Sequence, residues 1–440
     1  MFELDQVPDR QAAPAVAPTP AEVLAFAGSL AAGVEQLDDR ARIDLLRALE
    51  VLKCAAEGTQ VVVTADFDVS RRASAAARGV PEQRQGRGIA HQVALARRVS
   101  PHRGQRLTGL AKILVREMPC TLAALRAGRI TEWKATLLAR ETACLSLADR
   151  RSIDRQLAGD LDKIEKMGDR ELGDRARKLA AELDPASVVA RKRKAEADRG
   201  VTIRPAPDTM TWLTGRLPVK QGVAVYAALR AEADRLIGAG DGRSRGQIMA
   251  DTLVERVLGT PAVAVPVTVS VVISGDSLVG GSESAADIPG YGPIPAKVVR
   301  EWIRDGLAAD AEVELRRLFA DPSTGQLVAM ESAARFFPPP LAELIALRDQ
   351  RCRTPWCDAP VRHADHATAH DDGGVTSFVN GQGLCESCHY AKEAFGWTAR
   401  PRPGPAHVVE TTTPTGHIYR SRAPSVIEPR TARMDLAWAA

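Results

Sequence analysis

The chain has 440 residues, of which 45% are hydrophobic and 26% are charged. This composition is ordinary for a globular protein with several domains and at least one sizeable core. The formal net charge of +4 permits an anionic partner but does not argue for one. Residues 341–440 contain 11 Lys and Arg against 11 Asp and Glu, so any nucleic-acid binding there depends on where single charges lie.

The first residues, MFELDQVPDRQAAP, lack the basic and apolar segments of a secretory signal. The apolar run VAVPVTVSVVIS is too short to span a bilayer and is interrupted by proline. We therefore expect a cytoplasmic protein with no membrane partner, in which thiols stay reduced.

The first half of the chain is predicted to be helical. Residues 1–19 are rich in Pro and Ala and are expected to be a disordered lead-in. Residues 20–200 show amphipathic periodicity with repeated helix-start signals, which predicts a helical bundle. We expect three helix starts at Ser100-Pro101, Thr131 and Asp184-Pro185.

Two finer expectations concern this helical region. Thr121 is expected to open a helix that ends at Gly128. Trp133, Leu137 and Leu138 are expected to face the core, because their spacing places them on one side of the next helix.

Residues 201–337 change to a mixed α+β pattern. VTIRPAP and TMTWLTGRLP are predicted strands, and Val223–Leu236 and Gln247–Leu258 are predicted helices. VPVTVSVVIS is typical of a buried strand, GGSESAADIPGYGPIP of a loop, and ELRRLFADPSTGQLVAMES of a hairpin. Neither the glycines of 238–246 nor the basic run Arg191–Lys194 indicates a ligand site.

The last part is predicted to hold a small domain at residues 338–400, after a hinge at Pro338–Pro340 and the helix LAELIALRDQ. Residues 401–440 form a Pro/Thr-rich tail with one hairpin in VVETTTPTGHIYRSR. The fold class is therefore α+β: a helical N-terminal region, an α+β middle and a small metal-stapled domain near the C-terminus.

Four of the seven cysteines fall close together, as Cys352-x4-Cys357 and Cys385-x2-Cys388. In a reducing compartment, two such pairs favour a tetrahedral structural Zn²⁺ site over disulfides or unrelated thiols. A metal would also supply folding energy to a short, Gly-rich segment with little core of its own. Cys54, Cys120 and Cys144 are expected to be core or surface residues with no role.

Between the cysteine pairs lies Asp365-His366, followed by Asn380. Phosphodiester hydrolysis needs a metal to absorb charge and a base to deprotonate water. Asp365 is a candidate ligand of a divalent ion and His366 a candidate base, although such a pair alone also fits a surface turn. Asn380 is a candidate metal ligand, an anchor for the loop that aims His366, or a helix N-cap.

The segment LCESCHYAKEA is predicted to be a helix in which Cys385, Cys388, His389 and Lys392 share a broad face. Two cysteines can close the zinc site, while His389 projects beside it toward a catalytic ion or serves as a further zinc ligand. Lys392 lies one turn later and is a candidate phosphate contact.

The order Asp-His, Asn, His inside CxxxxC…CxxC resembles the HNH endonucleases, which have a ββα-metal fold. Related proteins carry an N-terminal domain of unknown function 222. Stretches such as LAALRAGRITEWKA and GDGRSRGQIMADTLVERVLG are similar to that domain, over about residues 30–330.

The resemblance implies residue roles. It makes His366 the general base, Asp365 and His389 ligands of a catalytic Mg²⁺ or other divalent ion, and Asn380 a ligand or orienting residue. Cys352, Cys357, Cys385 and Cys388 would hold the structural zinc. The chain departs from the family where a proline often follows the Asp-His pair, because Ala369 and His370 stand there; His363 and His370 are alternative ligands.

Two functions follow as hypotheses. The first is a DNA endonuclease, with the helical region in a targeting, dimerising or controlling role. The second is a zinc-stapled module that binds nucleic acid or protein without cutting, with a regulatory or interaction role for the helical region. Trp356 and Trp397 are interpreted as packing residues of the small domain.

Overall fold

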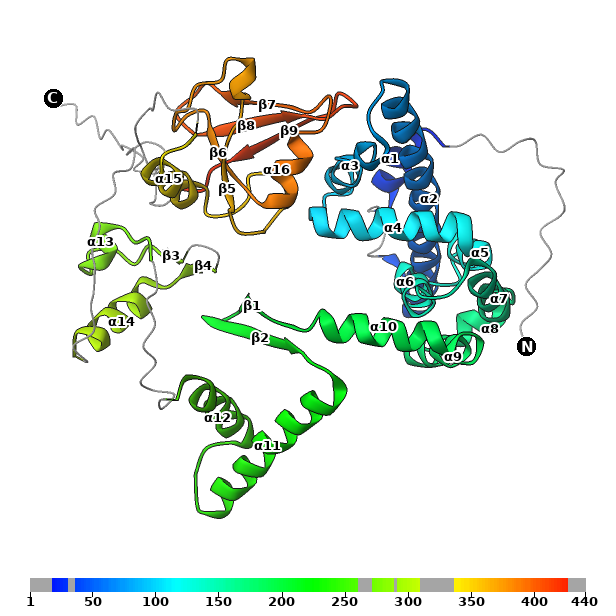
Figure 1. Cartoon of the computed structure of the whole chain (residues 1–440), viewed down its shortest axis with the longest axis horizontal. Coiled ribbons are helices and arrows are strands. Elements are labelled where there is room, and N and C mark those ends of the chain that lie inside the picture. The colour runs from blue at the N-terminus through cyan, green and yellow to red at the C-terminus, as the bar shows by residue number, and fades with distance from the viewer. Residues whose placement is uncertain (1–17, 31–35, 260–270, 289–290, 309–335, 426–440) are drawn as a thin grey trace.

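A computed structural model describes residues 18–30, 36–259, 271–288, 291–308 and 336–425 (Figure 1). The predicted hairpin around Asp321–Gly325 lies outside the described residues, as do residues 1–17 and most of VPVTVSVVIS. Among the helices that the structure describes, none combines the length and apolar character needed to cross a membrane.

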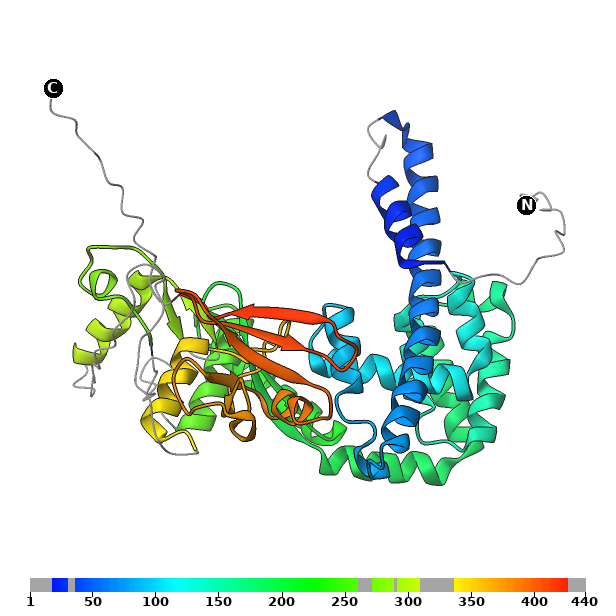
Figure 2. The same cartoon turned by 90° about the horizontal axis from the view of Figure 1, so that it is seen from above.

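The predicted helical region is confirmed. Its elements are α1 (Pro20–Ser29), α2 (Asp39–Ala77), η2 (Glu82–Arg84), α3 (Ile89–Ala96), α4 (Pro101–Glu117), α5 (Pro119–Arg126), α6 (Glu132–Glu141), α7 (Leu147–Ala158), α8 (Leu161–Lys166), α9 (Asp169–Leu183) and α10 (Pro185–Ala197). Helices α2 and α4 to α9 bundle around one apolar core, in which Leu114, Leu138 and Ile153 are fully buried, and α3 packs against α4. The start of α2 extends beyond the bundle, with α1 alongside it (Figure 2).

The predicted N-caps Ser100, Thr131 and Asp184 are confirmed, since each side chain accepts a hydrogen bond from the first turn of its helix. The predicted start at Thr121 is wrong, because α5 begins at Pro119. Asp154 of α7 accepts hydrogen bonds from the backbone nitrogens of Cys120 (2.7 Å) and Thr121 (2.9 Å) and so caps this helix from another element.

Leu137 and Leu138 are buried as expected, but the inward orientation of Trp133 is wrong. The Trp133 side chain is 46% exposed, and the Arg140 guanidinium lies 5.9 Å from its ring centroid. The cation covers one face of the indole, which lets it stay at the surface of the helix.

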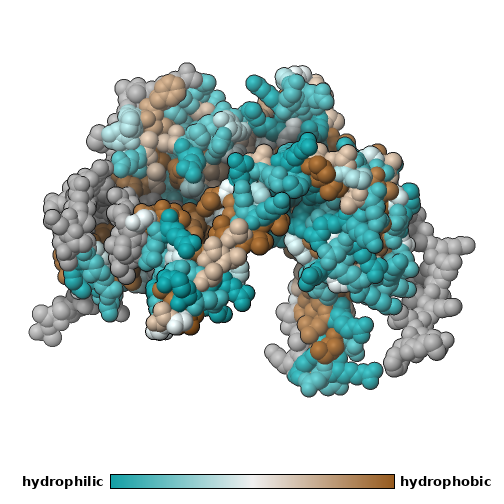
Figure 3. All heavy atoms as spheres, turned by 60° about the horizontal axis from the view of Figure 1, so that its bottom comes forward, coloured by the Kyte–Doolittle hydropathy of each residue, from teal (hydrophilic) through white to brown (hydrophobic). Residues whose placement is uncertain are grey.

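The middle of the chain contains β1 (Gly200–Ala206), β2 (Met210–Arg216), α11 (Val219–Gly238), α12 (Arg245–Leu258), α13 (Gly275–Leu278), β3 (Ala286–Ile288), β4 (Gly292–Ile294) and α14 (Ala296–Ala308). The predicted β1–β2 strands and α11 and α12 are confirmed. The predicted loop at 280–295 instead contains the short β3–β4 pair. Apolar side chains of β2 and α11, such as Trp212 and Tyr226, stay exposed. The side of the molecule drawn in Figure 3 shows several hydrophobic patches, coloured brown, among hydrophilic ones.

The C-terminal domain comprises α15 (Pro339–Asp349), β5 (His363–His366), η3 (His370–Asp372), β6 (Gly381–Leu384), α16 (Glu386–Lys392), β7 (Thr398–Arg402), β8 (Val408–Thr412) and β9 (Ile418–Arg422). Strands β5 and β6 form an antiparallel hairpin, with α15 on one side and α16 close to β5. The hairpin predicted after residue 400 is confirmed as β8–β9, and β7 joins it as a third strand.

The helical region contacts the C-terminal domain through α3, as both views show (Figures 1 and 2). His91 Nε2 lies 3.2 Å from Ser387 Oγ, and Thr415 Oγ1 donates to Gln92 Oε1 at 3.2 Å. Gly88, at φ 78°, precedes α3, and a Cβ there would lie 2.6 Å from Trp397 Nε1. A glycine is therefore required where the two parts meet.

Candidate functional site

Four buried cysteine sulfurs gather at the centre of the C-terminal domain. Cys352 and Cys357 come from the loop after α15, Cys385 is the N-cap of α16, and Cys388 lies in its first turn. All four sulfurs lie within 4.8 Å of one another, and Cys357 Sγ lies 3.8 Å from Cys385 Sγ. Zinc–sulfur bonds of about 2.3 Å in a tetrahedron give sulfur separations of about 3.8 Å. These cysteines can therefore hold a zinc ion.

The proximity of the sulfurs also shifts their ionisation. Hydrogen bonding to Cys352 and Cys357 holds the pKa of the Cys385 thiol far below its usual value. Hydrogen bonding, first to Cys352 and also to Cys385, raises the pKa of Cys388 and Cys357. A divalent cation would relieve this competition, because it favours the thiolate at all four positions.

A network of buried charged side chains at the end of α15 packs beside the cysteine cluster. The Arg348 and Asp349 side chains are 0% exposed, and Arg348 Nε donates to Asp349 Oδ1 at 2.7 Å. Arg353, next to Cys352, also donates to Asp349 Oδ1, at 3.1 Å, and to the Ser421 carbonyl oxygen at 2.6 Å. Burial raises the pKa of Asp349, but the two guanidiniums outweigh it and the pKa falls below its usual value.

A second group of possible ligands lies between the β5–β6 hairpin and α16. Asp365 Oδ1 is 3.7 Å from His389 Nε2, and one ligand atom each of Asp365, His389 and Glu393 lies within 4.8 Å of the others. Oxygen and imidazole ligands of this kind suit a divalent ion. The structure thus brings Asp365 and His389 together and adds Glu393, which the sequence analysis did not name.

The alternation of side chains along β5 separates the predicted pair. Asp365 is opposite Gln382 of β6, whose amide donates to Asp365 Oδ2 at 3.3 Å, on the face toward α16. His366 takes the other face, where its ring centroid is 4.6 Å from that of Phe337 and its Nε2 is 2.8 Å from Thr376 Oγ1.

Two flanking histidines, which the sequence analysis kept as alternatives, contact the predicted ones. His363 shares the face of Asp365, and its ring stacks on His389 with centroids 4.8 Å apart. The His370 ring lies edge-on to His366, with centroids 5.7 Å apart. His363 therefore lies beside the Asp365–His389 pair, and His370 beside His366.

Asn380 anchors the loop that follows β5. Its Oδ1 accepts from the Thr368 backbone nitrogen at 2.9 Å, and its Nδ2 donates to the carbonyl oxygens of Thr368 (3.0 Å) and Val375 (2.9 Å). It is not the N-cap of α16, because Cys385 holds that position. Of the interpretations left open, these contacts favour the loop anchor.

Lys392, a candidate phosphate contact, places its ammonium 2.8 Å from Asp365 Oδ2 and also donates to the His366 carbonyl oxygen. Its side chain is 11% exposed. Since Lys392 contacts Oδ2 and His389 faces Oδ1, the carboxylate can keep this ion pair and still offer an oxygen to a metal.

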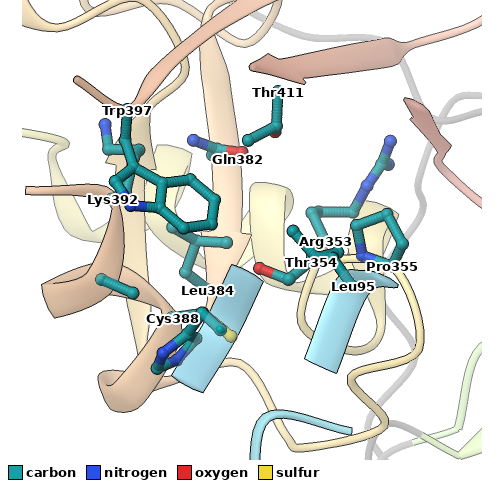
Figure 4. Close-up of a pocket in the computed structure, with 12 residues that line it drawn as sticks. Leu95, Arg353, Thr354, Pro355, Gln382, Leu384, Cys388, Lys392, Trp397 and Thr411 are labelled. Atoms are coloured by element: carbon teal, nitrogen blue, oxygen red, sulfur yellow. The ribbon is translucent and has the colours of Figure 1, made fainter. Parts of the chain in front are cut away.

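The α3 contact encloses a small cavity of about 20 Å³, roughly the space of one water. Figure 4 shows Leu95 on one side of it and Gln382, Lys392 and the Trp397 indole on the other. Trp397 is thus a packing residue, as predicted, at the junction with the helical region. Trp356 is 42% exposed and lies edge-on to Tyr419.

Comparison with known proteins places the chain in a family. A family model described as a domain of unknown function, DUF222, matches residues 46–349, well over half of the chain. The chain belongs to the DUF222 family. This confirms the resemblance predicted for the helical part, and the match ends at Asp349, just before the first cysteine of the cluster.

Among curated proteins, this DUF222 chain is similar to the uncharacterized protein Rv3776 of Mycobacterium tuberculosis. The two are 32% identical over 145 residues, which are 32% of this chain and 25% of the relative. The match therefore spans about a quarter of that relative's length. No solved structure matches this chain.

Two groups of site residues in this DUF222 protein escaped the sequence analysis. Glu393 follows His389 by four residues, so helical spacing alone could have placed it on the same face. The Arg348–Asp349–Arg353 network has no such signal, because charged residues at a helix end are usually exposed. They are buried because β6 and β9, which come later in the chain, pack around them and accept hydrogen bonds from Arg348 and Arg353.

Proposed function

We propose that the C-terminal domain is an HNH-type endonuclease that hydrolyses phosphodiester bonds in DNA with a divalent metal ion. The proposal rests on the approach of Asp365 and His389 to 3.7 Å between a β-hairpin and a helix, beside a separate set of four cysteines. A purely structural zinc domain has no need for this second group of ligands.

The residues present fit such an ion. Asp365 and His389 would hold it, with Glu393 as a third ligand, while Asn380 takes the orienting role through its loop contacts. When bound, a divalent ion would stabilise the negative charge that develops on the scissile phosphate and on the departing oxygen. Lys392 keeps Asp365 in place and can meet a phosphate that approaches this carboxylate.

His366 is assigned the role of general base that takes a proton from the attacking water. In its neutral form the imidazole has one ring nitrogen without a hydrogen, and this nitrogen is the proton acceptor. The contact between Nε2 and Thr376 Oγ1, 2.8 Å apart, holds the ring in place in either tautomer. His363 is the competing candidate, because it lies on the Asp365 face and stacks on His389.

The test is plasmid nicking by the full-length protein with Mg²⁺, Mn²⁺ or Ni²⁺. Loss of a general base costs a factor of about 10² to 10⁴, so His366→Ala should abolish visible nicking while zinc content stays intact. His363→Ala is the parallel variant. His417→Ala, at an exposed position just before β9, is the matched control.

The outcomes separate the hypotheses. Equal nicking by wild type and His366→Ala, together with loss in His363→Ala, would transfer the base role to His363. Absence of nicking by the wild type with every ion would contradict the nuclease and favour the non-cutting zinc module.

A further inference from the structure

We propose that an arginine-rich segment of the DUF222 domain, residues 69–106, binds the phosphate backbone of duplex DNA next to the candidate nuclease site. This inference rests on the proposed function and assigns the helical region the task of holding the substrate. The segment runs from the end of α2 through η2 and α3 to the start of α4.

Charge is concentrated in this segment. It contains nine arginines and one glutamate, a net charge of +8, whereas the whole chain carries +4, so the remaining residues together carry −4. The C-terminal end is balanced, with 11 basic against 11 acidic residues over 341–440. A DNA-cutting domain without net positive charge gains from positive charge on a neighbour, because phosphate contacts dominate affinity for DNA.

The arginines lie beside the candidate metal ligands. A cleft of about 130 Å³ opens between the end of α2 and the turn after α16. Arg71, Arg78, Arg84 and Arg87 line one side of it, and Glu393 is the one carboxylate among the lining residues. Glu393 also belongs to the Asp365–His389 group, so the cleft begins where the candidate metal site ends.

These arginines are not used to stabilise the fold through ion pairs. Within the described ranges, Arg71, Arg78, Arg84 and Arg87 form none, whereas Arg72 of the same helix pairs with Asp68 at 2.8 Å. Arg78 does lie over the Phe395 ring, 4.6 Å from its centroid. Arginines without acidic partners, grouped around a cleft, are suited to binding an anion such as a backbone phosphate.

The contact made by α3 holds the arginine-rich segment at a fixed distance from the candidate nuclease site. Gly88, His91 and Gln92 pack directly on the C-terminal domain, through Trp397, Ser387 and Thr415 respectively. DNA phosphates follow one another at regular spacing, so a rigidly attached row of guanidiniums can hold phosphates adjoining the one being cut.

The experiment measures binding of a labelled DNA duplex to the full-length protein, without added divalent ion, over a series of salt concentrations. Loss of two phosphate contacts should lower the salt slope of the association constant by about 2 in Arg84→Gln/Arg87→Gln. Arg84→Lys/Arg87→Lys keeps the charge and should keep the slope. Arg170→Gln/Lys178→Gln, at exposed positions of α9, is the control with the same charge loss.

Binding is read without cleavage, so this test is independent of nuclease activity. An unchanged slope in Arg84→Gln/Arg87→Gln, or an equal loss in the α9 control, would overturn the proposal. Tighter binding of an RNA duplex than of the DNA duplex would overturn the assignment to DNA. A reduced slope only in the Arg84/Arg87 variant supports the inference, even if the protein proves unable to cut.

Discussion

In the helical region, the largest fully buried side chains are Leu, Met and Ile, whereas in the C-terminal domain the largest is Arg348. The helical core formed by α2 and α4 to α9 is continuous and apolar. The C-terminal domain instead has small separate clusters, one of them made of the four cysteines and Leu384. The first region can fold by burying apolar surface, while the second has little apolar core and contains four cysteines that can hold a metal and a network of paired buried charges.

The same difference explains why the candidate metal-binding and catalytic residues lie in the C-terminal domain. Apolar cores favour no particular side-chain chemistry, but a domain held by polar groups already contains carboxylates, imidazoles and thiols in fixed positions. The three predictions below test this contrast by disturbing the cysteine cluster, the buried charges and a buried imidazole of the C-terminal domain.

The largest effect is expected from losing the zinc site. Structural zinc contributes about 10–16 kcal/mol in small zinc-binding peptides, which exceeds or equals the whole stability of a typical domain. Cys385→Ser should therefore release zinc and remove hydrogen-exchange protection from residues 336–425, while α4 to α7 stay protected. Cys144→Ser, a thiol beside the helical core, is the control and should retain zinc. Simultaneous loss of protection in both regions would show that they do not fold separately.

A smaller effect is expected from Asp349→Asn. The variant leaves Arg348 and Arg353, 0% and 3% exposed, without their buried counter-charge. Breaking a buried ion pair in this way costs about 3–5 kcal/mol, measured by urea unfolding of the C-terminal domain. Asp358→Asn, whose side chain is 81% exposed in a surface pair with Arg351, should cost about 1 kcal/mol or less. Equal losses for the two variants would contradict the role given to the buried network.

The smallest effect concerns pH. Burial and then Arg348 lower the pKa of His407 from 6.5 to about 4. The unfolded chain therefore takes up a proton first as the pH falls, and stability decreases between pH 6.5 and about 4, by about 1 kcal/mol for each unit. His407→Gln should remove this share of the decrease, while exposed His417→Gln should not. If the free energy of unfolding, measured with urea, falls equally with pH in wild type and His407→Gln, the role given to His407 is wrong.

Local patterns were enough for much of the fold. Ser100, Thr131 and Asp184 are N-caps because a short polar side chain before an apolar-periodic run is a local signal. The predicted start of α5 was wrong because the side chain that caps this helix belongs to Asp154, more than thirty residues away along the chain. The short β3–β4 pair was not predicted, because Gly and Pro in this stretch indicate a loop, yet three residue pairs form an antiparallel register there.

The sequence by itself determined the two cysteine pairs, the Asp-His, Asn and His order between them, and the helical character of the first part of the chain. These features depend on residue type and spacing, which are local. Tertiary structure alone decided that Glu393 joins Asp365 and that Arg348 is buried. It also brought the arginines of the DUF222 domain beside α16, because contacts between distant segments follow from packing and from no pattern within either segment.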